Sequence, residues 1–296
     1  MRTHPLFGVL IAAVGAIVLT PDTLFMRLSG MDAFTMLAWR GLLMAAALLV
    51  FWLLMAGRQA WAELRTVASM AGLIVIGCQA LNAVLFNAGV ATAPVSLVLF
   101  GVATVPVFSA IAAYIIAGER ITIATAITIV LVLLGIGIAV IGHNQEQIAL
   151  DGRAVFGAFA GLSVAIAFAT SFAIIRNNPS LALLPTVCIG ALLAGCIGLM
   201  LTDPARLFDG EVWAISVSGA VILPLSFMLI VTANRHTHPT NVSLLLLLEA
   251  VLGPLWVWWG VGEQMTWPMI LGGLIVVLSL GAYLIHLRRI SPARPM

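Results

Sequence analysis

The sequence predicts an all-α polytopic membrane protein, with ten transmembrane helices arranged as two inverted five-helix repeats. Hydrophobic residues make up 62% of the 296 residues and charged residues only 8%, whereas soluble domains carry about 25% charged residues. A chain this apolar could not cover its surface in water. Two further observations support the prediction: the number of long apolar stretches, and short motifs that recur in the same order in both halves.

Ten stretches are long enough to cross about 30 Å of hydrocarbon, which takes about 20 apolar residues. The connections between them are short, and only 142–152 and 202–211 form longer polar loops. The first stretch ends at Thr20-Pro21-Asp22 without a small-residue cleavage site, so we expect an uncleaved span and no signal peptide. The predicted spans are 6–27, 33–56, 67–90, 94–117, 121–141, 153–175, 181–201, 212–233, 240–260 and 267–287.

The two halves, 1–148 and 149–296, share motifs at matching places. Proline opens the fourth and ninth spans (Pro94 and Pro239), and Gly-Glu-x-x-Thr closes both, beginning at Gly118 and Gly262. Gly41 in the second span corresponds to Gly190 in the seventh. Five spans per half is an odd number, so the second half enters the membrane from the opposite side. Inverted repeats of this kind recur in secondary transporters, with the substrate site near the midplane between the halves.

Arginine placement predicts the orientation, because cytoplasmic loops are enriched in basic residues. With the N-terminus inside, nine of the 13 basic residues, all of them arginine, fall in inner loops and tails and three in outer loops. The remaining one, Arg40, lies within the second span. We therefore expect both termini in the cytoplasm.

Ten spans in a five-plus-five arrangement, with Gly-Glu-x-x-Thr closing the fourth and ninth, resemble the EamA-type proteins of the drug/metabolite transporter superfamily. The sequence is most similar to the bacterial exporters of aromatic amino acids and of cations such as paraquat. One departure is Glu249-Ala250, where the ninth span of these proteins often has Glu-Pro; here proline comes at Pro254. The resemblance implies a cavity lined by the first, third, fourth, sixth, eighth and ninth spans, export without ATP, and a bacterial inner-membrane location.

Glu249 is the strongest candidate for a functional residue, because a carboxylate at membrane depth is costly and commonly marks a site, a proton relay or an ion pair. It could bind a substrate ammonium or carry protons. The alternative is a structural pair with Arg40, the other deep charged residue that the sequence suggests. Arg40 could instead hold a substrate carboxylate or extend its head group to the interface.

The third span places Gln79, Asn82 and Phe86 on one helical face, at positions i, i+3 and i+7. An amide beside an aromatic ring suits an amphipathic substrate. Interhelical hydrogen bonding, worth only about 1 kcal/mol, is the alternative. Small and hydroxyl residues of the fourth and sixth spans have the same two interpretations, substrate binding and helix contact, because in membranes such residues serve first for packing. The candidate substrate-binding set is Asn82, Phe86, Gln79, Thr104, Phe108, Ser163 and Glu249.

Three prolines, Pro106, Pro224 and Pro254, fall inside predicted spans. Each removes a helical hydrogen bond, so each is a candidate kink, hinge or gate. The carbonyl that the missing bond frees must face protein or water, because lipid cannot satisfy it.

Other function classes find no support in the sequence. The net charge of +2 and the absence of a basic patch argue against nucleic acid. Three cysteines in apolar runs argue against a disulfide framework or metal cluster. We find no phosphate-binding loop, catalytic triad or cofactor motif, so we expect no cofactor, no metal site and no enzymatic activity.

The sequence therefore predicts a monomeric secondary exporter of small organic metabolites in the lipid bilayer. Neutral and aromatic amino acids are the first candidate substrates, and protons are a candidate coupling ion. A drug or nucleotide-sugar permease of the same fold is the first alternative, although no basic cluster suits phosphorylated cargo. A non-transporting membrane enzyme or scaffold is the second, and it would need more reactive groups at one depth than Glu249 and Arg40.

Overall fold

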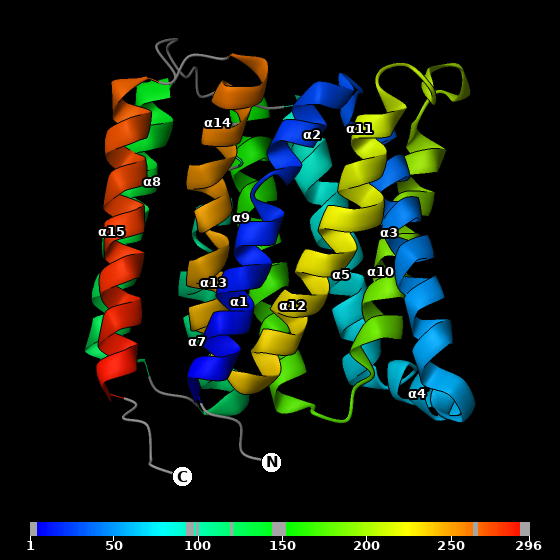
Figure 1. The fold of residues 1–296 in the computed structure, drawn as a ribbon, viewed down its shortest axis with the longest axis horizontal. Coiled ribbons are helices and arrows are strands. Elements are labelled where there is room, and N and C mark those ends of the chain that lie inside the picture. Colours follow the sequence, from blue (N-terminus) through cyan, green and yellow to red (C-terminus); the bar gives the residue numbers. More distant parts are fainter. Residues whose placement is uncertain are drawn as a thin grey trace.

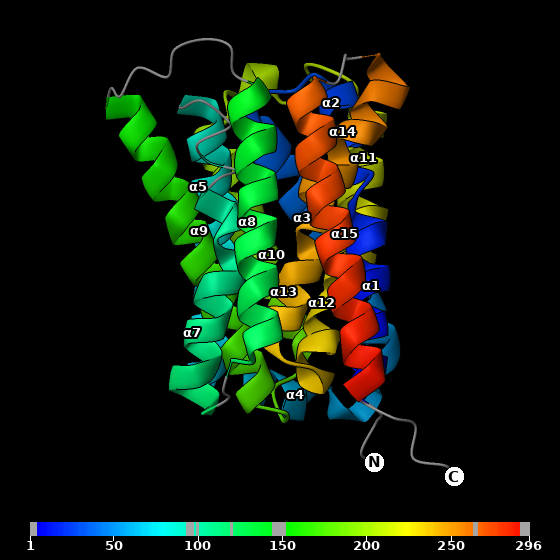
Figure 2. The same ribbon diagram turned by 90° about the vertical axis from the view of Figure 1, so that its left-hand side faces the viewer.

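The computed structural model of the protein is a bundle of long helices that run roughly parallel to one another (Figures 1 and 2). It describes residues 5–92, 98, 101–118, 121–143, 152–262 and 266–290. Helix α1 begins and α15 ends at the same end of the bundle, at the bottom of Figure 1. We call this the terminal side and the opposite end the distal side.

The first half of the chain forms α1 (Pro5–Leu19), α2 (Asp22–Ser29), α3 (Ala33–Ala56), the short helix η1 (Gly57–Gln59), α4 (Ala60–Val67), α5 (Met70–Thr92), α7 (Val105–Ala117) and α8 (Ile123–His143). The second half forms α9 (Gly152–Asn177), α10 (Leu183–Leu201), η2 (Pro204–Arg206), α11 (Val212–Val217), the π-helix η3 (Ser218–Ile222), α12 (Leu223–His236), α13 (Pro239–Leu246), α14 (Leu248–Val261) and α15 (Trp267–Ile290).

Eight helical segments of the described residues are long and apolar enough to cross a membrane, and each coincides with a predicted span. The predicted span 121–141 corresponds to α8, whose apolar part Ile123–Ile138 is shorter. The predicted span 94–117 is represented by α7, while 93–97 and 99–100 lie outside the described residues. The protein is therefore a multi-pass membrane protein, and the count of ten spans remains a prediction.

Helix pairing follows a regular pattern. Helix α3 packs against α10 at one edge of the bundle, and α8 packs against α15 at the other (Figure 1). Between the edges, α5 packs against α9 and α1 packs against α12, while α7 meets both α9 and α13. Exchanging each predicted span of the first half with its counterpart in the second turns each of these pairings into one that the structure also contains, for example α7–α9 into α13–α1.

Glycines allow the closest of these helix contacts, as expected where small residues bring backbones together in membranes. A Cβ on Gly41 of α3 would lie 2.5 Å from the backbone nitrogen of Gly195 in α10. A Cβ on Gly101 would lie 2.7 Å from the backbone carbonyl carbon of Gly161 in α9. Gly190, the predicted counterpart of Gly41, instead faces the side chain of Gln79 in α5, so the two glycines have different neighbours.

Two predicted spans are interrupted at matching places. A turn at Thr104 precedes α7, and a turn at Leu247 separates α13 from α14. Both interrupted spans end in glycine with positive φ, Gly118 (+67°) and Gly262 (+78°), whose amides bond back to Tyr114 and Trp258. Glycine adopts this left-handed conformation without the steric cost that a side chain adds, so it ends helices in this way. The glutamates that follow these glycines lie outside the described residues.

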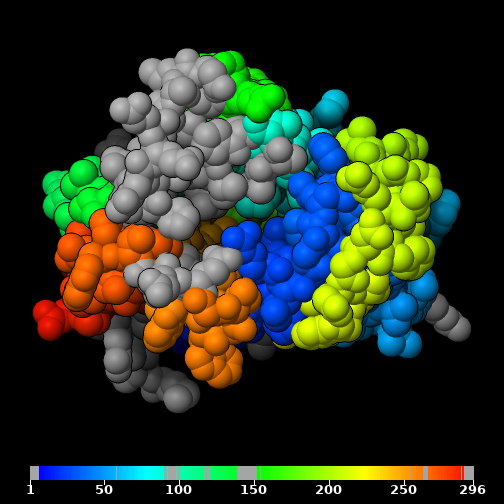
Figure 3. Space-filling view, turned by 90° about the horizontal axis from the view of Figure 1, so that it is seen from above, coloured from blue at the N-terminus to red at the C-terminus, as the bar shows by residue number. Residues whose placement is uncertain are grey.

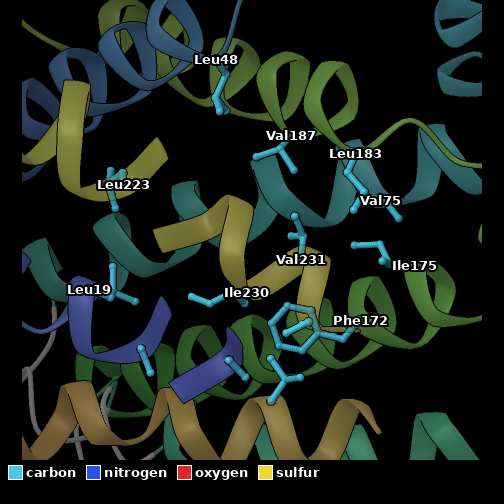
Figure 4. Packing of buried hydrophobic residues seen from close by; sticks show 14 of the residues in the cluster. Leu19, Leu48, Val75, Phe172, Ile175, Leu183, Val187, Leu223, Ile230 and Val231 are labelled. Carbon is cyan, nitrogen blue, oxygen red and sulfur yellow. The ribbon is translucent and has the colours of Figure 1, made fainter. Parts of the chain in front are cut away.

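The hydrophobic core fills the part of the bundle between α1, α9, α10 and α12 (Figure 4). Phe172 of α9 is fully buried in a cluster that also contains Leu19 of α1 and Ile230 and Val231 of α12. A ring contact of 5.5 Å between Phe7 and His236 continues the contact between α1 and α12 at the terminal side. The bundle is thus tightly packed from its centre to the ends of these helices.

Asp32 caps helix α3 on the distal side, outside the membrane-spanning segments. Its Oδ1 accepts hydrogen bonds from the amides of Phe34 (3.0 Å) and Thr35 (3.1 Å), and its Oδ2 accepts from the Thr35 hydroxyl. Burial by itself raises the pKa of the Asp32 carboxyl, but these hydrogen bonds and the nearby Arg206 outweigh it. The folded-state pKa of Asp32 therefore lies below its ordinary value of 3.8.

Replacing Asp32 with alanine is expected to destabilise the protein by about 1 kcal/mol, the usual cost of a lost N-cap. Because the folded pKa is lowered, the carboxylate stabilises the protein above its unfolded pKa, and this contribution disappears as the pH falls through the folded value. Asp32→Ser keeps a capping oxygen without a titrating group. Thermal unfolding of the three proteins between pH 7 and pH 3 checks this: wild type should approach Asp32→Ala at low pH, while Asp32→Ser should keep a constant offset from Asp32→Ala.

Candidate functional site

Asp22 reaches the interior of the bundle because the first span is interrupted. Helix α1 ends at Leu19, and α2 begins at Asp22 after Thr20 and Pro21. Proline lacks the amide hydrogen that a continuous helix needs, so it favours a break here. The side chain of Asp22 is 1% exposed. Sequence reasoning missed this residue, although a proline followed by an acid inside the predicted span 6–27 was the available signal.

Both carboxylate oxygens of Asp22 have partners. Oδ2 forms an ion pair with the guanidinium of Arg40 in α3. Oδ1 accepts a 2.5 Å hydrogen bond from the hydroxyl of Ser218, the first residue of the π-helix η3. Gly219 lets η3 approach α3, because a Cβ there would lie 3.1 Å from the Cα of Arg40. Asp22 thus joins the broken first span to α3 and to the irregular part of the eighth.

The structure corrects the suggested pairing of Glu249 with Arg40. The carboxylate bound to Arg40 is Asp22, which lies much closer to it in the sequence and on an adjacent helix. Arg40 is largely buried: its Nη1 contacts the Met26 sulfur at 3.0 Å, and its Nε has no hydrogen-bond partner among the described residues. The expectation that Glu249 and Arg40 are the deep charges was also wrong, since Asp22 is a third.

Glu249 faces the same network from the second half of the chain. It shares one face of α14 with Gly253, Trp256 and Gly260, at positions i, i+4, i+7 and i+11. A Cβ on Gly253 would lie 2.5 Å from the Thr23 hydroxyl, and Gly260 lies as close to Leu24. The indole nitrogen of Trp256 donates to the Thr20 hydroxyl at 2.9 Å. This face of α14 therefore lies along the α1–α2 break.

The Glu249 carboxyl lies within the electrostatic field of both Asp22 and Arg40. It is partly exposed, and no described residue forms a hydrogen bond with it. Seen from the distal side, the orange α14 lies directly beside the blue α1–α2 segment (Figure 3). Of the two acids, Asp22 and Glu249, it is therefore Glu249 whose carboxylate oxygens form no hydrogen bond with a described residue. We call Asp22, Arg40, Ser218 and Glu249 the deep polar cluster.

The other predicted substrate-binding residues lie on different helices. On α5, Gln79 and Asn82 are each 8% exposed and Phe86 is partly buried. Gln79 packs against Gly190 of α10, because a Cβ added to Gly190 would lie 3.0 Å from the Cβ of Gln79. Gln79 therefore lies in the contact between α5 and α10. No hydrogen bond between described residues links these three to the deep polar cluster.

Thr104, Phe108 and Ser163 also lie apart from that cluster in the hydrogen-bond network. The Thr104 hydroxyl donates to the Gly101 carbonyl at 2.6 Å, which stabilises the turn before α7. Phe108 lies on α7 and Ser163 on α9, both partly buried, and these two helices pack against each other. Their role in substrate binding stays a prediction.

Two of the three candidate hinge prolines follow an irregular backbone segment. Pro106 lies in the first turn of α7, directly after the Thr104 turn, and Pro224 lies in the first turn of α12, directly after η3. Proline fits a first helical turn, where its missing amide hydrogen is not needed. Pro254 lies inside α14, seven residues after the Leu247 turn. The hinge role of all three remains a prediction.

A second buried polar network joins the ninth, fifth and tenth spans. The Tyr283 hydroxyl donates to Asn241 Oδ1 at 2.7 Å and lies 2.9 Å from the Thr125 hydroxyl. The amide nitrogen of Asn241 donates to the Thr237 hydroxyl at 3.0 Å. Each of these polar atoms has at least one hydrogen-bond partner, which is typical of a network that fixes helices.

Tyr283→Phe is expected to cost about 1–2 kcal/mol of unfolding free energy, because it leaves the buried Asn241 and Thr125 oxygens without their shared partner. Tyr114 provides a matched control, since it is 61% exposed on α7. Unfolding in mixed micelles should show the loss for Tyr283→Phe and almost none for Tyr114→Phe. Equal effects of both substitutions would contradict the assignment.

An apolar groove on another part of the bundle does not involve the deep polar cluster. It has a volume of about 330 Å³ and lies between α3, α4 and α10, lined by Leu42, Trp52, Leu64 and Ile189 among others. The residues at its rim, Leu49 and Leu192, are each 43% exposed. This groove therefore lies on the outside of the bundle, where lipid chains would meet it.

The structure is thus a helical bundle with three interrupted spans and a buried charge network between its halves, and it can be compared with known proteins. Residues 6–141 match the EamA-like transporter family. The match covers the α1–α8 half, which includes Asp22 and Arg40.

One solved structure extends the likeness to the whole chain. It is described only as "Crystal structure of protein", and it superimposes with a TM-score of 0.79 over 99% of this chain and 100% of its own. Its sequence is 15% identical, so the likeness concerns the fold alone. No curated protein matches the sequence significantly. The comparisons therefore relate the first half of the chain to the EamA-like transporter family and the whole chain to a known fold, and they leave the substrate open.

Proposed function

We propose that this protein is a secondary transporter that moves small amphipathic organic molecules across a bacterial inner membrane by alternating access. The observation that carries the proposal is the deep polar cluster, whose charged groups come from both halves of the chain. Asp22 and Arg40 belong to the first half, and Ser218 and Glu249 to the second. Buried charges inside membrane spans are rare and usually functional. A network that crosses between the halves must change when they move.

The pairing of helices supports two inverted repeats, 1–148 and 149–296, as the moving units. Pairings such as α5 with α9 and α1 with α12 exchange with each other when the halves are exchanged. The turns at Thr104 and Leu247 fall at equivalent places in the fourth and ninth spans. Interrupted helices of this kind line the substrate sites of many secondary transporters.

The packing supports a form that is closed on the terminal side. The core around Phe172 and the Phe7–His236 contact fills the bundle there. With the termini in the cytoplasm, as the arginine distribution predicts, this form is closed to the cytoplasm. Transport then requires α1 and α12 to separate at their terminal-side ends.

The proposed substrates are amphipathic molecules with an amino group, and aromatic amino acids are the first to test. Glu249 offers a carboxylate for the amino group, and Trp256 on the same face of α14 offers an aromatic surface. A phosphorylated substrate fits less well, because Arg40, the cation of the deep polar cluster, is already paired with Asp22.

The test is efflux of radiolabelled phenylalanine from proteoliposomes that contain the purified chain, with and without a pH gradient. Saturable efflux above that of empty liposomes supports a transporter, and stimulation by the gradient supports coupling to protons. Saturable efflux that ignores the gradient indicates a facilitator. No saturable efflux of phenylalanine, or of other aromatic amino acids and amines, contradicts the proposal.

Glu249→Gln is expected to flatten the pH dependence of transport and to reduce its rate at least tenfold, because the substitution removes the deep group that can exchange a proton. Glu211→Gln is the matched control, since Glu211 is exposed in the distal loop before α11. Efflux measured between pH 5.5 and 8.5 should follow the wild-type profile for Glu211→Gln. A wild-type profile for correctly folded Glu249→Gln would exclude Glu249 as a proton carrier.

A further inference from the structure

Helices α3 and α10 touch in their distal halves and leave a groove between them towards the terminal side. A Cβ on Gly41 would lie 2.5 Å from the Gly195 nitrogen. A Cβ on Gly198 would lie equally close, at 2.5 Å, to the Ala38 nitrogen. Directly after Gly41, from Leu42 onwards, the same two helices line the apolar groove of about 330 Å³. The close glycine contacts therefore close this groove at its distal end.

Helix α4 lies at the terminal end of the groove (Figure 1), and its Leu64 is one of the lining residues. Two hydrogen bonds hold α4 in this position. The indole nitrogen of Trp52 in α3 donates to Glu63 Oε2 at 2.5 Å. The amide of Ala182, the residue before α10, donates to the Thr66 hydroxyl at 3.0 Å. The groove thus has two helical walls and a fixed end.

The groove has the length and the chemistry of a lipid chain site. From Leu42 to Trp52 it follows α3 for ten residues, which is about 15 Å along a helix axis. One leaflet contributes half of a hydrocarbon core about 30 Å thick, which is also about 15 Å. The polar hydrogens of the lining side chains are used within the protein, since Trp52 donates to Glu63 and the Cys188 thiol donates to the Ala45 carbonyl. The groove therefore presents an apolar surface.

The exposed charge next to this groove is positive. Arg65 directly follows Leu64 in α4 and is exposed, and Trp61, four residues before it on the same face, is 70% exposed. The acid of α4, Glu63, is partly buried and accepts the hydrogen bond from Trp52. Tryptophan and arginine together are typical of the membrane interface, and a guanidinium binds phosphate strongly. Helix α4 thus offers a phosphate-binding group at the mouth of an apolar groove.

We propose that this groove is a binding site for an anionic phospholipid of the terminal-side leaflet, with one acyl chain between α3 and α10 and the phosphate at Arg65. The site lies outside the deep polar cluster and does not depend on the transport function. A helix of a second copy fits less well: it is about 10 Å wide, so a 15 Å length of it occupies roughly 1,200 Å³, several times the volume of the groove. A single extended chain is narrow enough to enter.

Native mass spectrometry of the purified, delipidated full-length protein tests the head-group contact. It is titrated with phosphatidylglycerol and with phosphatidylcholine of identical acyl chains. We expect the first phosphatidylglycerol to bind about fivefold more tightly, the effect of one arginine near an anionic lipid. Arg65→Gln should remove this preference, while Arg153→Gln, at an exposed position at the distal end of α9, should keep it. Equal binding of the two lipids by the wild type would overturn the proposal.

Filling the groove tests the acyl-chain contact. Ala46 lines the groove and is exposed, so Ala46→Phe places a ring where the chain would lie without displacing the backbone. It should weaken the tightest binding of either lipid at least about tenfold, because the chain loses the apolar surface that it would cover. Ala126→Phe, at an exposed position on α8, is the matched control and should bind lipid as the wild type does. Unchanged binding by folded Ala46→Phe would contradict the site.

Photo-crosslinking of the unaltered protein locates the lipid even if Ala46→Phe does not fold. Phosphatidylglycerol with a diazirine in one acyl chain is incorporated into liposomes with the wild-type chain, irradiated, and the labelled peptides are mapped. We expect the label to concentrate in 42–52 of α3 and 185–192 of α10. A label spread evenly over the lipid-facing helices, or a dimer that Ala46→Phe dissolves, would overturn the proposal. Neither result bears on transport, which is measured separately by efflux.

Discussion

Replacing Asp22 with alanine is expected to lower the free energy of unfolding by about 3–5 kcal/mol, because it leaves the guanidinium of Arg40 buried without its partner. The ion pair lies between α2 and α3, and Asp22 is 1% exposed. Water therefore cannot replace the lost carboxylate easily. Ser218 loses its acceptor at the same time, which adds the cost of an unsatisfied buried hydroxyl.

A double variant, Asp22→Ala with Arg40→Met, separates the loss of the pair from the loss of packing. Removing both charges avoids the uncompensated guanidinium, so we expect it to recover at least half of the stability lost by Asp22→Ala. Asp209→Ala, at an exposed loop position on the same side, should be neutral within about 0.5 kcal/mol. Unfolding titrations in mixed micelles measure all three. An Asp22→Ala protein as stable as wild type would show that the pair does not form.

The second large effect is expected at the contact between α3 and α10. Gly41→Leu should destabilise the protein by about 3 kcal/mol or more, because overpacking typically costs about 1–3 kcal/mol and a clash with backbone atoms cannot be relieved by a side-chain movement. The Cβ of a new side chain would lie 2.5 Å from the Gly195 nitrogen and 2.6 Å from its Cα. Backbone atoms of two long helices would have to separate to make room.

Gly77 provides a matched control for Gly41. It lies inside α5, is exposed, and a Cβ there would meet nothing within 4 Å. Gly77→Ala should therefore stabilise the protein slightly, by about 0.5–1 kcal/mol, because alanine favours the helix over glycine. Thermal unfolding in detergent should move in opposite directions for the two variants. A neutral Gly41→Leu would mean that α3 and α10 do not pack as closely as the structure places them.

The ends of the helices could be predicted where the chain itself contains the signal. Asp32 begins α3 and Gly118 and Gly262 end α7 and α14, because a capping carboxylate and a left-handed glycine act on neighbouring backbone. The break before Asp22 carried a signal of the same kind in Pro21, but the apolar residues on both sides made the span look continuous. The π-helix at Ser218 carried no comparable signal.

The candidate site was less predictable, because it depends on which helix faces which. The sequence indicated a deep acid, Glu249, and a deep base, Arg40, and opposite charges at similar depth suggested a pair. In the structure, Arg40 instead forms an ion pair with Asp22. Gln79, which shares a helical face with Asn82, packs against Gly190 of α10 rather than beside Glu249.

The sequence by itself determined that this is a membrane protein with long apolar helices, where most of those helices lie, and that Glu249 is at membrane depth. These properties follow from composition and local pattern, because each span forms its backbone hydrogen bonds within its own helix and meets lipid with its own apolar side chains. Only the tertiary structure decided that Asp22 is buried, that it pairs with Arg40, and that Glu249 has no ion-pair partner among the described residues. Partner choice among buried charges depends on distances between helices far apart in the chain, and those distances are fixed by packing at residues such as Gly219 and Gly253.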